Sequence, residues 1–191
     1  MKENNRIIIF GFSGSGKSTL ADMLGKELGL RVIHPSSILR NLIEHKALNI
    51  AKSKAGKGFW ESDRGIATFK QRLKEPEPID LLCDKILLRE FKKGKVVIDS
   101  WSLPWLTKQG FKVCLQASLK TRTERVAERS KVSLVRAKTT IIMKDRETRK
   151  LYLQHKGFDI KQDTGVFDLI LDTEKLTKKE VLSIFLNKLT Q

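Results

Sequence analysis

Eight residues near the start of the chain have the types and the spacing of a phosphate-binding loop. Residues 11–18 read Gly-Phe-Ser-Gly-Ser-Gly-Lys-Ser, which follows the pattern Gly-x4-Gly-Lys-Ser. The glycines allow consecutive backbone N–H groups to converge on phosphate oxygens, Lys17 reaches the β- and γ-phosphates, and the Ser18 hydroxyl binds Mg²⁺. The pattern therefore predicts that the chain binds a nucleoside triphosphate. The contacting residues are expected to be Gly11, Ser13, Gly14, Ser15, Gly16, Lys17, Ser18 and Thr19.

The residues on either side of the loop predict the strand and the helix that this chemistry requires. Residues 6–10 are a short β-branched run suited to a buried strand, and residues 17–28 continue with helical spacing. A helix that begins at the loop directs the positive end of its dipole at the phosphates. Strand, loop and helix thus follow in the order that the motif requires, which favours a ligand site over a glycine-rich turn.

The rest of the chain alternates strands with helices. Further apolar strands are expected at 31–33, 95–99, 111–115 and 168–172, and helices at about 36–46, 64–74, 79–92, 119–130, 133–153 and 178–189. This alternation predicts an α/β fold in which a parallel five-stranded sheet carries helices on both faces and binds ligands at the carboxyl ends of its strands. The phosphate loop follows the first of these strands.

Composition places the chain among globular proteins of one domain. It has 191 residues, of which 40% are hydrophobic and 31% charged. No apolar run approaches the roughly 18 residues that span a bilayer, and the first strand follows the N-terminus without a signal-peptide region. The chain is therefore expected to be cytoplasmic, without membrane contact, and monomeric. Cys83 and Cys114 lie far apart in apolar stretches, which favours buried free thiols over a disulfide or a metal pair.

The formal net charge of +16 indicates anionic partners. Nucleotides meet this expectation, and so do RNA, DNA and anionic lipid. The lysines occur throughout the chain rather than in one tail, so a solvated lysine-rich surface is the alternative to a nucleic-acid contact.

Several segments beyond the loop resemble one family of enzymes. Residues 28–33 read Leu-Gly-Leu-Arg-Val-Ile and are followed by Ile38-Leu39-Arg40, while residues 122–129 are similar to the pattern R-x-x-R-[IV]-A-x-R. Tyr152, the stretch Gly-Phe-Asp-Ile at 157–160 and the stretch Phe-Asp-Leu-Ile-Leu-Asp-Thr at 167–173 follow in the family's order. Over nearly its whole length the sequence resembles the nucleoside monophosphate kinases of the phosphate-loop class, most closely the short archaeal cytidylate kinases.

The resemblance implies a three-layer P-loop kinase fold within one domain, residues 1–191. An acceptor-binding insertion would occupy about 36–75 and a mobile lid about 122–150, the lid closing over ATP to exclude water. ATP and Mg²⁺ are the implied cofactors and a nucleoside monophosphate is the implied acceptor. Arg40 stands where the family places an arginine that binds the acceptor's phosphate.

Arginines in the predicted lid are candidates for charge stabilisation during phosphoryl transfer. Arg122, Arg125 and Arg129 recur at i, i+3 and i+7, so they share one helix face beside the predicted nucleotide site. Arg146 and Arg149 are expected to add cations in the transition state. The alternative is a solvated face in which these arginines pair with Glu124, Glu128 and Glu147.

Two aspartates are candidates on the metal and acceptor sides. Asp99 ends an apolar strand, from which a carboxylate can hold Mg²⁺ or its waters, and the family also has an acidic residue there; capping the following turn is the alternative. Asp80 matches an acidic position near the family's acceptor pocket, although an aspartate that opens a helix explains it equally well.

The sequence departs from the family on the acceptor side. Where the family reads Asp/Glu-Gly-Arg, this chain has Asp99-Ser100-Trp101, and residues 34–37 read His-Pro-Ser-Ser in place of Ser-[Thr/Ala]-Gly-[Asp/Glu]. Trp101 and Trp105 either stack on an acceptor base or pack in the interior.

The function implied is transfer of the ATP γ-phosphoryl group to CMP, dCMP or a related monophosphate. A kinase or ATPase acting on another small molecule or on a nucleic-acid end is an alternative, because Trp101 replaces an arginine. A nucleotide-dependent RNA-binding factor is the second alternative, because of the high charge.

Overall fold

Five parallel strands form the centre of the molecule. The fold was obtained as a computed structural model, which describes residues 6–45, 58–72 and 78–190. The strands are β1 (Arg6–Phe10), β2 (Arg31–Ile33), β3 (Val96–Asp99), β4 (Phe111–Gln116) and β5 (Leu169–Asp172), in the order β2-β3-β1-β4-β5. The predicted five-stranded parallel sheet is confirmed, with each strand within one residue of its expected bounds.

Helices connect the strands as the alternation predicted. The long helices are α1 (Lys17–Leu28), α2 (Pro35–His45), α3 (Asp63–Arg72), α4 (Ile79–Lys92), α6 (Leu119–Ser130), α7 (Leu134–Lys156) and α8 (Lys178–Thr190). Sequence periodicity missed three short elements, α5 (Leu103–Leu106) and the 3-10 helices η2 (Phe59–Glu61) and η3 (Thr164–Val166). Elements of three or four residues are too short to display a repeat.

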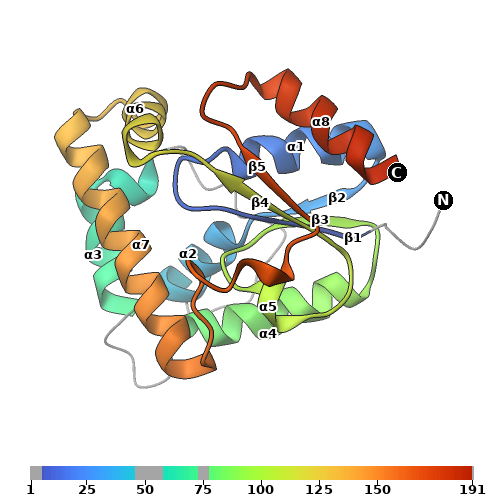
Figure 1. Ribbon diagram of the computed structural model, residues 1–191. Coiled ribbons are helices and arrows are strands. Elements are labelled where there is room, and N and C mark those ends of the chain that lie inside the picture. Colours follow the sequence, from blue (N-terminus) through green and yellow to red (C-terminus); the bar gives the residue numbers. More distant parts are fainter. Residues whose placement is uncertain (1–5, 46–57, 73–77, 191) are drawn as a thin grey trace.

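The alternating residues of β1 hold together the two helical layers. Ile7 and Ile9 are fully buried in a cluster with α1 and α8, whereas Ile8 belongs to a cluster with α2 and α4 on the other face. Successive strand residues point to opposite faces, so a run of isoleucines serves both layers. Figure 1 shows α1 and α8 on one face of the sheet and α4 with α5 on the other.

The carboxyl ends of the strands meet the remaining helices. In Figure 1, α3, α6 and α7 lie together beyond the end of the sheet to which the strand arrows point. Two ion pairs join these elements, Arg129 to Glu61 and Arg136 to Asp63. The segment containing η2 and α3 and the segment containing α6 and α7 are therefore neighbours at the end where ligands bind in this class of fold.

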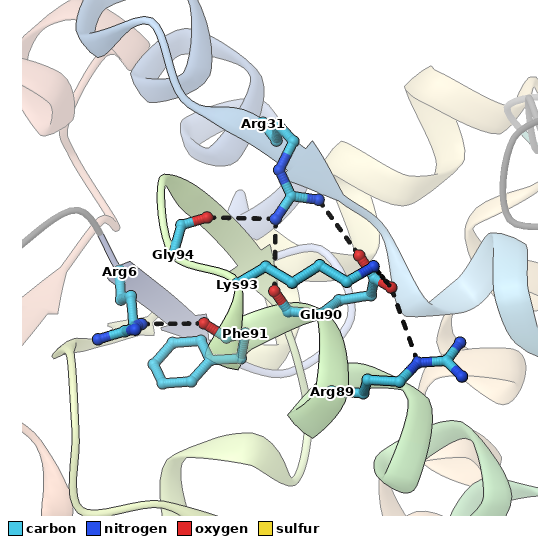
Figure 2. A network of polar contacts seen from close by, with 7 residues as sticks. All are labelled: Arg6, Arg31, Arg89, Glu90, Phe91, Lys93 and Gly94. Carbon is cyan, nitrogen blue, oxygen red and sulfur yellow. Dashed lines mark hydrogen bonds and ion pairs between the residues drawn. The ribbon is translucent and has the colours of Figure 1, made fainter.

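A cluster of charges fastens the opposite end of the sheet, around Glu90 of α4 (Figure 2). The Glu90 carboxylate accepts hydrogen bonds from Arg31 at 3.2 Å and from Lys93 at 2.6 Å, and these cations lower the pKa of Glu90, Lys93 most strongly. Arg6 donates from the start of β1 to the Phe91 carbonyl at 3.0 Å. The first residues of β1 and β2 are thus tied to the end of α4.

The structure bears on two further expectations, the state of the cysteines and the presence of a membrane-spanning helix. Cys83 and Cys114 are buried free thiols, as expected from the sequence. Within 6–45, 58–72 and 78–190, no helix has both the length and the apolar character needed to cross a bilayer.

Candidate active site

The loop between β1 and α1 has a backbone that requires glycine at two positions. Gly11 has a φ of 154°, and a Cβ there would lie 2.3 Å from Ser15 Oγ and 2.5 Å from the Leu115 carbonyl oxygen. Gly14 has a φ of 86°, and a Cβ there would lie 2.6 Å from the Arg122 carbonyl oxygen. Any side chain at either position would displace the loop from β4 or from α6.

A cavity of about 590 Å³ opens beside this loop. One part is formed by residues 13–19 of the loop and α1, together with Asp99 and Arg125. The other part is formed by residues of α2, η2, α4, α7 and the segment after β3, among them Leu39, Trp60, Glu61, Asp80, Asp84, Trp101, Ser102, Lys144 and Tyr152. The cavity therefore extends from the phosphate loop to the elements where the sequence predicted the acceptor.

Lys17 is held within the loop and faces Trp101. Its Nζ donates to the Phe12 carbonyl oxygen at 3.2 Å and lies 5.5 Å from the centroid of the Trp101 indole. Only 8% of Lys17 is exposed, and burial lowers its pKa to about 8, with the Asp99 charge opposing that effect. The ammonium group therefore lies at the loop with one hydrogen bond to the backbone, and its positive charge is available to an anionic ligand.

Ser18 and Asp99 are brought together at the start of α1 and the end of β3. The Ser18 hydroxyl donates to Asp99 Oδ2 at 2.5 Å. Hydroxyl and carboxylate oxygens are ligands that Mg²⁺ prefers, so this pair fits the ion that the loop motif implies.

His34 occupies the other oxygen of Asp99. Its Nδ1 lies 3.0 Å from Asp99 Oδ1, and its Nε2 lies 3.0 Å from Asp22 Oδ1. The hydrogen bond to Asp99 is the main cause that raises the pKa of His34 to about 9. The imidazole is therefore protonated at neutral pH and donates to both carboxylates, which fixes the orientation of Asp99.

The three arginines of α6 have different positions. Arg125 and Arg129 line the cavity; Arg125 donates to the Thr173 carbonyl oxygen at 2.6 Å, and Arg129 lies 3.3 Å from Glu61 Oε1. Arg122 does not line it. Its guanidinium donates to the Ser13 carbonyl oxygen at 3.2 Å and to Asp145 at 2.7 Å, so it supports the loop from the side away from the cavity.

The structure does not bring Arg146 and Arg149 to this cavity. They line a second cavity of about 990 Å³, where Arg146 pairs with Glu147 and Arg149 with Asp159. The reason is helix rotation. Lys144, Thr148 and Tyr152 of α7 face the first cavity, and residues 146 and 149 stand about 200° and 140° around the helix from Lys144.

Of the residues expected to bind the acceptor, Asp80 and Trp101 line the cavity and Arg40 does not. The Arg40 guanidinium lies over the Phe59 ring, 4.8 Å from its centroid, and joins α2 to η2. Trp105 is partly buried, packs against Phe158 and donates to the Asp163 carbonyl oxygen at 2.9 Å. Residues 46–57 and 73–75 of the insertion expected at 36–75 lie outside the described residues.

Sequence reasoning missed four residues that contribute to the site, namely Glu61, Asp84, Lys144 and His34 as a partner of Asp99. For Asp84 a signal existed, because it follows Asp80 by one helical turn and so shares its face of α4. The other three carry no local signal, since their partners lie on distant elements.

Comparison with known proteins gives consistent matches. The sequence model described as the cytidylate kinase-like family matches residues 6–175. A protein from Pyrococcus horikoshii named cytidylate kinase is 29% identical over 96% of this chain and 87% of its own length. Another of that name, from Ignicoccus hospitalis, is 31% identical over 92% of this chain and 94% of its own length.

Among solved structures, two kinases share the fold. Shikimate kinase from Acinetobacter baumannii matches with a TM-score of 0.54 at 15% identity, over 96% of this chain and 92% of that chain. Deoxyadenosine kinase from M. mycoides matches with a TM-score of 0.56 at 17% identity, over 97% of this chain and 100% of that chain. At such identities the likeness concerns the fold, which is the three-layer fold expected from the sequence.

Proposed function

Because this chain belongs to the cytidylate kinase-like family, we propose that it transfers the γ-phosphoryl group of ATP to CMP, dCMP or a related nucleoside monophosphate. The observation that carries the proposal is a single cavity that joins Lys17, Ser18 and Asp99 at one part to α2, η2 and α4 at the other. Donor and acceptor can therefore meet within one cavity.

Each donor-side residue has a defined task in this reaction. The loop amides and Lys17 bind the β- and γ-phosphates, and Arg125 supplies positive charge from α6. Phosphoryl transfer needs little covalent help from the protein, so alignment and charge account for most of the acceleration. Arg122 positions the loop through its hydrogen bond to the Ser13 carbonyl oxygen, from outside the lining of the cavity.

Ser18 and Asp99 are the residues that would hold Mg²⁺. The ion, when bound, offsets the negative charge of the β- and γ-phosphate oxygens. The His34 imidazolium keeps the Asp99 carboxylate turned toward Ser18.

We assign the acceptor's phosphate to Arg129 and Lys144 rather than to Arg40. Both cations line the cavity, and both lie close enough to Lys17 to influence its pKa. Lys144 stands over the Trp60 ring, with its Nζ 5.8 Å from the centroid. These two residues compensate for the arginine that Trp101 replaces.

The test is an ADP-release assay with ATP, Mg²⁺ and a panel of acceptors. CMP or dCMP is expected to raise turnover at least tenfold above the rate with ATP alone, with UMP and AMP weaker. The proposal fails if no monophosphate exceeds that background.

The same assay tests a second candidate function. Trp101 at the position of the family arginine, and the buried carboxylates of Asp80 and Asp84, favour an acceptor without a phosphate. Cytidine, a shikimate-like alcohol and a 5′-hydroxyl oligonucleotide therefore belong in the panel. Turnover with one of these and with no monophosphate would select the second function.

Lys17→Ala is expected to lower kcat by about a thousandfold, because it removes a cation from the transferred phosphate. Lys26→Ala is the matched control, since Lys26 is an exposed lysine of the same helix and does not line the cavity. Melting temperatures of both variants check the fold. Activity of Lys17→Ala within tenfold of the wild type would contradict the role of Lys17.

A further inference from the structure

Asp84 is a buried carboxyl group on the acceptor side of the cavity. It lies on α4, is 4% exposed, and lines the cavity beside Ser102 and Tyr152. Its Oδ1 accepts hydrogen bonds from the Ser102 hydroxyl at 2.5 Å and from the Tyr152 hydroxyl at 3.2 Å. Its Oδ2 is buried and has no hydrogen-bond partner among the described residues.

An unpaired carboxyl oxygen of this kind is costly to bury. Nearly all buried polar atoms in proteins have a hydrogen-bond partner, from the protein or from ordered water, and each exception calls for an explanation such as a bound ligand or a catalytic role. Ser102 and Tyr152 hold Oδ1 from two different elements, so the carboxyl group cannot rotate freely to find another partner. The carboxyl oxygen Oδ2 is therefore held in place for a donor that the described residues do not provide.

The charge around Asp84 defines which donor fits. Asp80, one turn earlier on α4, is 3% exposed and lines the same cavity. Burial, with a contribution from the Asp80 charge, raises the pKa of Asp84 to about 7. A ligand amino group with two N–H bonds would donate to both carboxylates and so favour the ionised form of Asp84, whereas a carbonyl oxygen would be repelled by them unless Asp84 is protonated.

We propose that Asp84, assisted by Asp80, recognises the exocyclic amino group of the acceptor base and thereby selects cytosine over uracil. This inference rests on the proposed transfer to a nucleoside monophosphate. Cytosine carries an amino group with two N–H donors at the position where uracil carries a carbonyl oxygen. A ligand that cannot donate leaves the acceptor atoms of such a site unpaired. This costs far more binding free energy than the loss of a methylene contact does.

The experiment measures binding rather than turnover. CMP and UMP are titrated calorimetrically into the wild type, Asp84→Asn, Asp80→Asn and the control Glu27→Gln. Glu27 is an exposed carboxylate of α1 that does not line the cavity, so its replacement changes the net charge equally and leaves the site intact. ATP binding and the melting temperature confirm that each variant is folded.

The wild type and Glu27→Gln should bind CMP at least tenfold more tightly than UMP. Asp84→Asn should lower the affinity for CMP by about ten- to a hundredfold, which corresponds to the loss of a charge-assisted hydrogen bond. The affinity for UMP should change by less than about threefold. Asp80→Asn should reduce the CMP preference in the same direction by a smaller factor.

Two results would overturn the inference. One is a wild type that binds UMP as tightly as CMP. The other is a pair of folded Asp84 and Asp80 variants that keep the wild-type ratio of CMP to UMP affinity within twofold. If the proposed function is wrong, no monophosphate will increase ADP release. The ratio of CMP to UMP affinity can still be measured in that case, because calorimetry does not require turnover.

Discussion

The protonation of the Asp84 carboxyl group affects the stability of the folded chain. Burial raises its pKa from 3.8 to about 7, with Asp80 adding repulsion and with Ser102, Tyr152 and Lys156 opposing. Below about pH 4 the group is protonated in both states, so its contribution to stability is complete. Between pH 4 and about 7 the unfolded chain loses this proton first, so stability falls as pH rises.

Asp84→Asn should remove this pH dependence. A pKa difference of about 3 corresponds to about 4 kcal/mol, which is an upper value because Asp80 titrates with Asp84. We expect the melting temperature of the variant minus that of the wild type to increase by several degrees as the pH is raised from about 4.5 to 8. A constant difference across this range would show that Asp84 does not gain its proton on folding.

Single residues could be predicted from the sequence where their signal is local. Lys17 and Ser18 belong to one continuous motif, and Asp99 ends an apolar strand, so their meeting at the strand ends follows from parallel topology. Glu61 and Lys144 carry no such signal, because their significance depends on partners in other elements. The Arg40 prediction followed a family pattern, and in the structure this side chain packs on Phe59.

At the level of elements, one buried carboxylate joins the two segments that flank the cavity. Glu61 of η2 is 3% exposed and accepts from Ser130 at 3.1 Å and from Arg129 at 3.3 Å. Arg136 of α7 donates to the Glu61 carbonyl oxygen at 3.1 Å. Contacts around Glu61 therefore contribute to the position of the predicted lid relative to η2.

Glu61→Gln should lower kcat/KM for the acceptor about tenfold, because a charge-assisted hydrogen bond to Arg129 is replaced by a neutral one. ATP hydrolysis without acceptor should rise relative to transfer, since the two segments then exclude water less well. Both rates come from one ADP-release assay.

Asp63→Asn provides the comparison for Glu61→Gln. Asp63 also pairs with a lid arginine, but its side chain is 97% exposed, and such surface pairs contribute little. The two variants should therefore differ in kcat/KM by at least about fivefold. Equal effects would mean that burial of Glu61 is not what matters.

Helix positions could be predicted from the sequence, but helix rotation could not. The bounds of α1 and α4 match those expected from periodicity. Helix α7 carries charged residues around its circumference, so its sequence does not reveal which face meets the cavity. For this reason Arg146 and Arg149 seemed suited to the site, whereas Lys144 is the cation of α7 that lines it.

For the whole molecule, the net charge of +16 predicts a salt-dependent affinity for polyanions. We expect binding of single-stranded RNA to weaken at least tenfold between about 50 and 200 mM salt, because bound phosphates release counterions. Filter binding or anisotropy at several salt concentrations measures this. Lys17→Ala should bind RNA as the wild type does, since Lys17 is only 8% exposed.

RNA binding that ignores salt and is fully competed by ATP would contradict this prediction. It would place the RNA in the nucleotide cavity rather than on the basic surface. The charge of a whole chain can be counted from its sequence, but its distribution around the two cavities depends on the fold.

The contact between Trp101 and Lys17 also has an optical consequence. An indole ring whose centroid lies 5.5 Å from an ammonium nitrogen experiences a strong local electric field, and its emission wavelength reports that field. Arrival of phosphates at Lys17 cancels part of the positive charge beside the ring. Trp105 packs among Phe10, Phe158 and Phe167. The centroid of the Trp60 ring lies 5.8 Å from Lys144 Nζ and Trp60 also lines the cavity, so a Trp60→Phe background assigns the signal to Trp101. The chain thus carries an intrinsic fluorophore at the junction of its donor and acceptor sides, and nucleotide occupancy can be followed in it without a label.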